Sequence, residues 1–86
     1  MALQMFNSAD DVCAALRQKI ADTIDDAQVA VRANSPGHFE IEVTSKVFAG
    51  TSRVQQQQLV YGAIKDLMAG NDAPVHAIDR LVTKTP

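Results

Sequence analysis

Cysteine is almost absent from the sequence, which has one Cys among its 86 residues. A lone cysteine excludes a disulfide within the chain and is typical of proteins from a reducing compartment. No apolar run approaches the roughly 20 residues of a membrane span, and the first residues lack the basic and apolar segments of a signal peptide. We therefore expect a cytoplasmic protein that has no contact with a membrane.

Positive charge is also scarce, because 8 Lys and Arg residues stand against 10 Asp and Glu residues, which gives a net charge of −2. Strong non-specific attraction to a phosphate backbone needs a clustered excess of cations. The charge balance argues against such attraction, although it leaves room for a local basic patch.

The common motifs of catalysis and metal binding are missing too. The sequence has no Cys pair, no Gly-rich phosphate loop and no His–Glu zinc motif. Glu40 and Glu42 resemble paired catalytic acids, but they alternate along a predicted strand and are expected on a solvated face. Because no nucleophile, base and orienting group converge, we do not predict an enzyme.

What is present is an ordinary globular composition, with 47% hydrophobic and 21% charged residues. A chain of this length can bury one modest core. We expect a single domain over residues 1–86, with the folded core at 7–83 and a tail at 84–86.

The first helix is expected to begin after Ser8, a favourable N-cap, and to end near Asp25. Asp11 stands three residues after Ser8, as in a capping box. Apolar residues then recur at steps of three and four and predict one buried face, made of Cys13, Leu16, Ile20 and Ile24.

Two strands follow, because apolar and polar residues alternate on either side of a turn at 34–37. Pro36 and Gly37 supply the turn chemistry. The residues expected to point inward are Val29, Val31 and Ala33 on the first strand and Phe39, Ile41 and Val43 on the second.

A second helix is expected from Ser52 to Ala69, with Gln55 completing a capping box and Gly70 providing the stop. A last strand is expected over 75–82. The order helix–strand–strand–helix–strand describes a small α+β fold, and its strand–helix–strand unit makes the second and third strands parallel. The result is a three-stranded mixed sheet with both helices on one face.

Four glutamines, Gln55 to Gln58, occupy the start of the second helix, where a helix that reads nucleic acid would carry cations. Gln57 falls within the predicted apolar face, where its amide can bond backbone groups at the edge of the core. Leu59 is expected to point away from the core. The predicted apolar face consists of Val54, Val60, Tyr61, Ile64, Leu67 and Met68.

The segment HFEIEVTSKVFAGTSRVQQQQLVYGAI, followed later by VHAI, resembles the BolA-like family. The likeness spans roughly residues 8–83 and is greatest to the bacterial YrbA (IbaG) branch. It implies a small fold similar to class II KH domains. The family pattern of Phe-x-Gly, a helical Val-Tyr pair and a late His-Ala is matched by Phe48, Gly50, Val60, Tyr61, His76 and Ala77.

The resemblance implies a monothiol glutaredoxin as partner, a shared 2Fe–2S cluster, and a role in cluster trafficking or the stress response. His76 matches the family's late-chain ligand, and His38 matches a second ligand from the loop between the first two strands. Parallel pairing of the second and third strands predicts both histidines at one end of the sheet. Two imidazoles cannot complete a set of four ligands, and Cys13 is expected to be buried, so the partner must supply thiolates.

Some relatives bind DNA, so the alternative function is a transcription regulator that uses the helix at 51–69. The candidate contact residues for nucleic acid or a protein partner are Arg53, Gln56 and Leu59. Many members have Arg-His-Arg where this sequence has Gln56-Gln57-Gln58, which leaves at most weak DNA binding. A third hypothesis is a metal-free protein–protein adaptor that uses Leu59 and the sheet edge. Alone, the chain is expected to be a monomer or weak homodimer.

Overall fold

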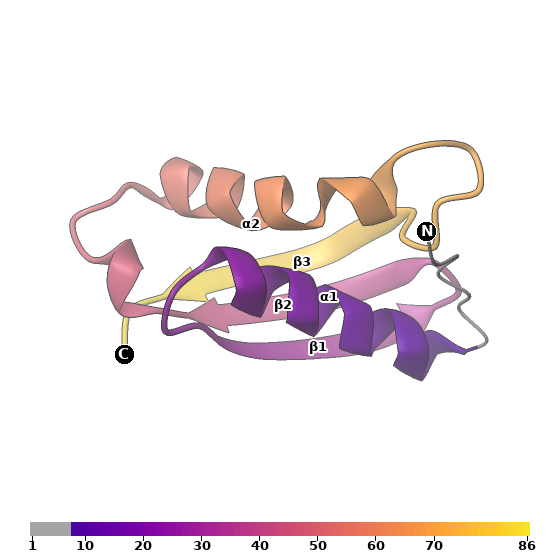
Figure 1. Cartoon of the computed structure of the whole chain (residues 1–86), viewed down its shortest axis with the longest axis horizontal. Coiled ribbons are helices and arrows are strands. Elements are labelled where there is room, and N and C mark those ends of the chain that lie inside the picture. The colour runs from indigo at the N-terminus through magenta and orange to yellow at the C-terminus, as the bar shows by residue number, and fades with distance from the viewer. Residues whose placement is uncertain (1–7) are drawn as a thin grey trace.

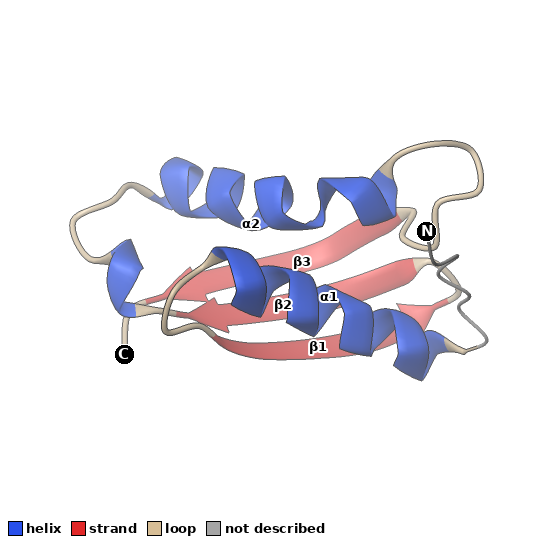
Figure 2. Ribbon diagram, viewed as in Figure 1, coloured by secondary structure: helices blue, strands red, loops and turns tan. Residues whose placement is uncertain are grey.

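The structure is a computed structural model that describes residues 8–86, and it places two helices against a three-stranded sheet, as Figure 1 and Figure 2 show. The predicted order of helices and strands is confirmed. Within residues 8–86, neither helix is long and apolar enough to cross a membrane. The elements are α1 (Ala9–Thr23), β1 (Gln28–Ser35), β2 (His38–Thr44), the short 3-10 helix η1 (Lys46–Phe48), α2 (Arg53–Met68) and β3 (Ala77–Lys84).

The sheet has β2 at its centre, in the order β1-β2-β3. β1 and β2 are antiparallel, and β2 and β3 are parallel, so the predicted mixed sheet is confirmed. Both helices lie on one face of the sheet (Figure 1), where they also contact each other. No helix of residues 8–86 covers the other face of the sheet, which we call the open face (Figure 1).

The last strand lies two residues later than the predicted range of 75–82, because it begins at Ala77 and not at Val75. β3 runs to Lys84, a residue that the prediction assigned to the tail. Lys84 pairs with Thr44, and its carbonyl accepts a hydrogen bond from the Ser45 amide at 3.0 Å. The strand therefore continues until β2 itself ends, because each further residue finds a backbone partner.

Alternation along β2 decides which face of the sheet is buried. Phe39, Ile41 and Val43 are at most 2% exposed, and the residues between them are only half-buried. Each fully buried side chain of this size contributes about 1.5–3 kcal/mol. The facing residues are Val12, Cys13, Leu16 and Ile20 of α1 and Val60, Ala63, Ile64 and Leu67 of α2, so the burial predicted for Cys13 is confirmed.

Local signals fix the starts of both helices. The Ser8 hydroxyl accepts a hydrogen bond from the Asp11 amide at 3.2 Å at the start of α1. At α2, the Ser52 hydroxyl accepts from the Gln55 amide at 3.1 Å, and the Gln55 side chain accepts from the Ser52 amide at 3.0 Å. The predicted capping box of α2 is therefore confirmed.

The buried face of α2 is rotated from the predicted one. Val54 is 61% exposed and Tyr61 is 39% exposed, so the prediction that they join the core is wrong. Val60, Ala63 and Leu67 are buried and define a narrower apolar stripe. The predicted stripe also included Val54 and Tyr61, which moved its expected centre around the helix.

The glutamine that bonds backbone groups is Gln56 rather than Gln57. Its Nε2 donates to the carbonyl oxygens of Phe48 and Thr51 at 3.2 Å each. Its Oε1 accepts from the Thr83 hydroxyl at 2.6 Å. Gln56 precedes Val60 by one helical turn, which places it on the buried stripe, where it ties η1, α2 and β3 together.

Candidate functional site

The two histidines predicted as ligands lie at the same end of the sheet. His38 is the first residue of β2, and its register partner on β3 is Ala77, which directly follows His76. The carbonyl oxygen of Gly37 accepts from the amides of both His76 and Ala77, at 2.8 and 3.1 Å. Neither ring is sealed in the core: the His38 side chain is 44% exposed, and His76 is an exposed residue. We call this end of the sheet the histidine rim.

Gly37 fixes the approach of His76 to the rim. It sits in the hairpin turn with φ of 80°, in the left-handed region that favours glycine. A Cβ atom at this position would collide with Cδ2 of the His76 ring and lie 2.8 Å from Cγ. The imidazole of His76 therefore occupies the space that a side chain at position 37 would fill.

His38 is held by a different contact. Its Nδ1 lies 2.9 Å from Oδ1 of Asp79, and the other carboxylate oxygen of Asp79 accepts from Asn34 Nδ2 at 3.1 Å. The hydrogen bond to His38, with a smaller contribution from Asn34, lowers the pKa of the Asp79 carboxyl. Asp79 is therefore ionised at neutral pH and orients the His38 ring.

The two histidines of the rim could supply two of the four ligands that a 2Fe–2S cluster needs. Across residues 8–86, no three or more His, Cys, Asp or Glu side chains gather in a way that could hold a metal ion. Cys13 is buried against the core, and burial raises the pKa of its thiol, which disfavours the thiolate that binds metals. The rim thus offers two imidazoles, and a 2Fe–2S cluster held by two His and two Cys ligands is known chemistry. The residues present fit such a cluster when a second protein brings the thiolates.

Comparison with known proteins identifies the family. A family model described as "BolA-like protein" matches residues 13–86. The chain belongs to the BolA-like family. It is 43% identical over 49 residues to the UV-induced protein uvi31 of Schizosaccharomyces pombe, a match that covers 57% of this chain and 45% of that protein. The matched part is therefore less than half of that relative.

Solved structures of BolA-like proteins share the fold. The solution structure of BolA1 from Mus musculus superposes with a TM-score of 0.72 and 31% identity, over 100% of this chain and 76% of that one. A bolA protein homologue from Coxiella burnetii gives 0.71 and 26%, over 94% of each chain. The recognised family and the α+β architecture are confirmed, while the YrbA branch and the class II KH likeness stay predictions.

The three other candidate residues of this BolA-like chain do not join the histidine rim. α2 begins after β2 and η1 have ended, so Arg53, its first residue, lies at the opposite end of the sheet from His38. Leu59 is 43% exposed on α2, as predicted. The Gln56 amide is bonded to groups of its own chain, and its contact with a partner or nucleic acid stays a prediction.

A hollow of about 510 Å³ borders the rim on the helix side of the sheet. It lies between the first turn of α1, the hairpin turn and the loop before β3, and Val12, Phe39 and Pro74 contribute apolar walls. Gly37 lines it as well, so the hollow and the rim share one turn. The described part of the chain thus places an apolar hollow beside the two exposed histidines.

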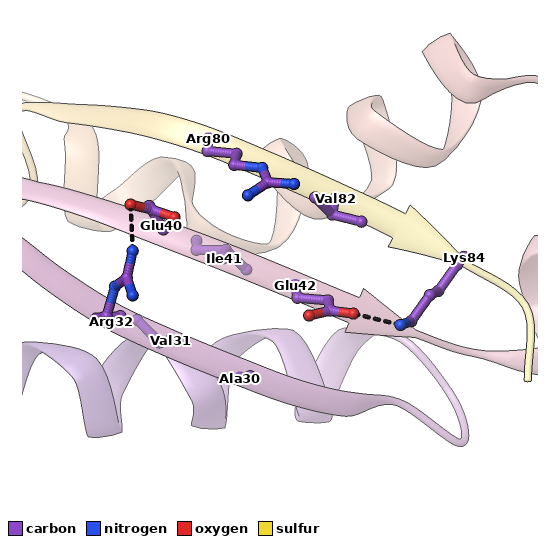
Figure 3. A pocket seen from close by; sticks show the side chains of 9 residues that line it. All are labelled: Ala30, Val31, Arg32, Glu40, Ile41, Glu42, Arg80, Val82 and Lys84. Atoms are coloured by element: carbon purple, nitrogen blue, oxygen red, sulfur yellow. Dashed lines mark hydrogen bonds and ion pairs between the residues drawn. The ribbon is translucent and has the colours of Figure 1, made fainter.

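The open face of the sheet carries paired charges, as Figure 3 shows. Arg32 contacts Glu40 at 2.7 Å, and Lys84 pairs with Glu42. The hydrogen bond from Arg32 lowers the pKa of Glu40, and the one from Lys84 lowers the pKa of Glu42. Both carboxylates are therefore paired with cations of the same face of the sheet.

Sequence reasoning missed the groups that hold the two rings. Asp79 lies three residues after His76, but its contact with His38 depends on the register between β2 and β3, which the sequence does not display. Gly37 was recognised as a turn residue, whereas its contact with His76 follows only from the parallel pairing.

Proposed function

We propose that this chain is a non-enzymatic accessory protein of iron–sulfur metabolism. It binds a monothiol glutaredoxin and, with His76 and His38, completes the ligand set of a 2Fe–2S cluster that the two proteins share. Cluster trafficking or a stress response is the setting that this role fits. The cluster is a shared cargo, so the isolated chain carries none.

The observation that carries this proposal is the placement of two exposed histidines, His38 and His76, at one end of the sheet. The backbone hydrogen bonds from His76 and Ala77 to Gly37 place the start of β3 beside the hairpin turn, next to His38. Neutral imidazole binds iron, and the rest of the described chain offers no accessible thiolate. The missing ligands must then come from a partner that carries cysteine or thiol groups.

The partner is proposed to dock around the hairpin turn rather than on the start of α2. The hollow beside Gly37 offers apolar contact next to the rim, whereas Arg53 lies at the other end of the sheet. Exposed Leu59 lies on α2 and provides a candidate contact for a partner large enough to reach it.

The test is a titration of this chain into a cluster-loaded monothiol glutaredoxin, followed by visible absorption and circular dichroism. The wild-type chain is expected to change the cluster bands, because imidazole replaces another ligand. His76→Ala and His38→Ala should each reduce that change, and Gln58→Ala, an exposed control on α2, should not. Unchanged bands with wild-type protein would refute the proposal. If His76→Ala changes the cluster bands as much as the wild-type chain does, His76 is not a ligand, although the partner is still bound.

The same samples distinguish the DNA-binding alternative. A regulator that reads DNA through α2 should retard duplex DNA in a gel, and its affinity should fall steeply with salt. The internal use of Gln56 and the net charge of −2 both speak against that outcome. A salt-sensitive gel shift without any change in the cluster bands would favour the alternative.

A further inference from the structure

We infer that Asp79, supported by Asn34, is a positioning residue that holds the proton of His38 on Nδ1 and presents Nε2 as the ligand atom. The inference rests on the proposed function for its link to the cluster. The part that concerns the tautomer of His38 in the isolated chain depends only on the hydrogen bonds among Asn34, Asp79 and His38.

Asn34 and Asp79 each stand at a point where the pairing register with β2 shifts, so neither residue has a register partner on β2. On β1, Ala33 pairs with Phe39 and Ser35 with His38, so Asn34 is left over. On β3, Ile78 pairs with Phe39 and Arg80 with Glu40, so Asp79 is left over. A bulge re-aims the side chain of its extra residue, and bulges are frequent beside functional sites. Here each of the two strands that flank β2 has one such irregularity, and both lie next to Phe39 of β2.

Donor and acceptor chemistry determines which nitrogen of the His38 ring carries the hydrogen. Asn34 Nδ2 can only donate, and it donates to Oδ2 of Asp79 at 3.1 Å. The ionised carboxylate can only accept, so Nδ1 of His38, 2.9 Å from Oδ1, must carry the hydrogen. The lone pair of the neutral ring is then on Nε2. Carboxylates that fix the tautomer of a ligand histidine in this way are common around metal sites.

Stability alone is a poor explanation for the arrangement. The side chains of His38 and Asp79 are 44% and 39% exposed, and ion pairs at exposed sites contribute about 0–1 kcal/mol. Each bulge also interrupts the backbone pairing of the sheet. What the contacts do fix is the orientation and the tautomer of one exposed ring.

The first experiment uses the isolated protein and long-range ¹H–¹⁵N correlation spectra of its two imidazoles, at a pH where the rings are neutral. Wild-type His38 is expected to show the Nδ1–H tautomer. Asp79→Ala should shift His38 toward the Nε2–H tautomer and leave His76 unchanged. Glu42→Ala removes one carboxylate from the same open face and is the matched control, which should alter neither ring. An Nε2–H tautomer of His38 in the wild type, or no response to Asp79→Ala, would overturn the inference.

The second experiment measures loss of the cluster from the glutaredoxin complex by its visible bands. Removal of such a supporting carboxylate typically weakens metal binding 10–100-fold. Asp79→Ala is therefore expected to accelerate cluster loss by about 10-fold or more, with Glu42→Ala close to wild type. If His38→Ala accelerates the loss and Asp79→Ala does not, the positioning role is wrong and the proposed function stands. If neither histidine variant has an effect, the proposed function fails, and the tautomer spectra still decide whether Asp79 fixes the ring.

Discussion

Replacement of Gly37 by alanine is expected to damage the histidine rim and to destabilise the fold. The residue has φ of 80°, and alanine in the left-handed region costs about 1–2 kcal/mol. The new methyl group would also collide with the His76 ring, and forcing an extra group into a filled space costs about 1–3 kcal/mol. The loss of freedom in the unfolded chain offsets about 0.4–1 kcal/mol. The net loss of unfolding free energy should be about 1–5 kcal/mol.

Gly50 is a matched control for this prediction. It has φ of 75°, nearly the same backbone strain, but a Cβ there would meet nothing within 4 Å. Gly50→Ala should therefore lower the unfolding free energy only by the cost of the left-handed backbone less the unfolded-state gain, about 0–1.6 kcal/mol. The difference between the two variants isolates the contact with His76.

The assay is urea unfolding followed by circular dichroism at 222 nm, combined with the imidazole signals of His76. Gly37→Ala should lower the midpoint more than Gly50→Ala and should move the His76 signals, while Gly50→Ala leaves them in place. Equal losses in the two variants, with unmoved His76 signals, would refute the reasoning that Gly37 provides the space for this ring.

Three further predictions concern other parts of the chain. Gln56→Ala should lower the unfolding free energy by about 1–3 kcal/mol because it leaves half-buried partners unpaired, whereas exposed Gln58→Ala should change it by less than about 0.5 kcal/mol, as measured by urea unfolding. The pKa values of the Asp79 and Glu40 carboxyls are lowered in the folded protein, so the stability that these two groups contribute is complete above the ordinary carboxyl pKa and is lost as pH falls through the lowered pKa values. Carboxyl ¹³C titrations should give both groups pKa values below those of ordinary Asp and Glu side chains, and ordinary pKa values would contradict this prediction. Burial raises the pKa of Cys13, so a thiol reagent at pH 8 should label it far more slowly in the folded protein than in urea, and equal rates would show that the thiol is accessible.

Much of the architecture follows from local patterns. Alternation along β2 predicted the buried side of Phe39, Ile41 and Val43, and the cap residues Ser8 and Ser52 predicted both helix starts. These features depend on neighbours within one turn or one strand, so the sequence displays them directly.

The rotation of α2 was harder to predict, because a helix can present more than one apolar stripe. Val54 and Tyr61 are seven residues apart and form a line of their own on the exposed side. The sequence cannot tell which line faces the sheet until the partners of α2 are known. Gln56 shows the same limit, since its hydrogen bond with Thr83 joins α2 to β3 across 27 positions of the chain.

The candidate site depends on one non-local fact, the parallel pairing of β2 with β3. That pairing brings His76 onto Gly37 and leaves Asp79 as the unpaired residue beside His38. A shift of β3 by one residue would reverse the faces of its side chains and separate the carboxylate from the ring. Substitutions that loosen this register should therefore impair both histidines together, whereas Asp79→Ala should affect His38 alone. That contrast separates a loss of the sheet from a loss of the positioning contact.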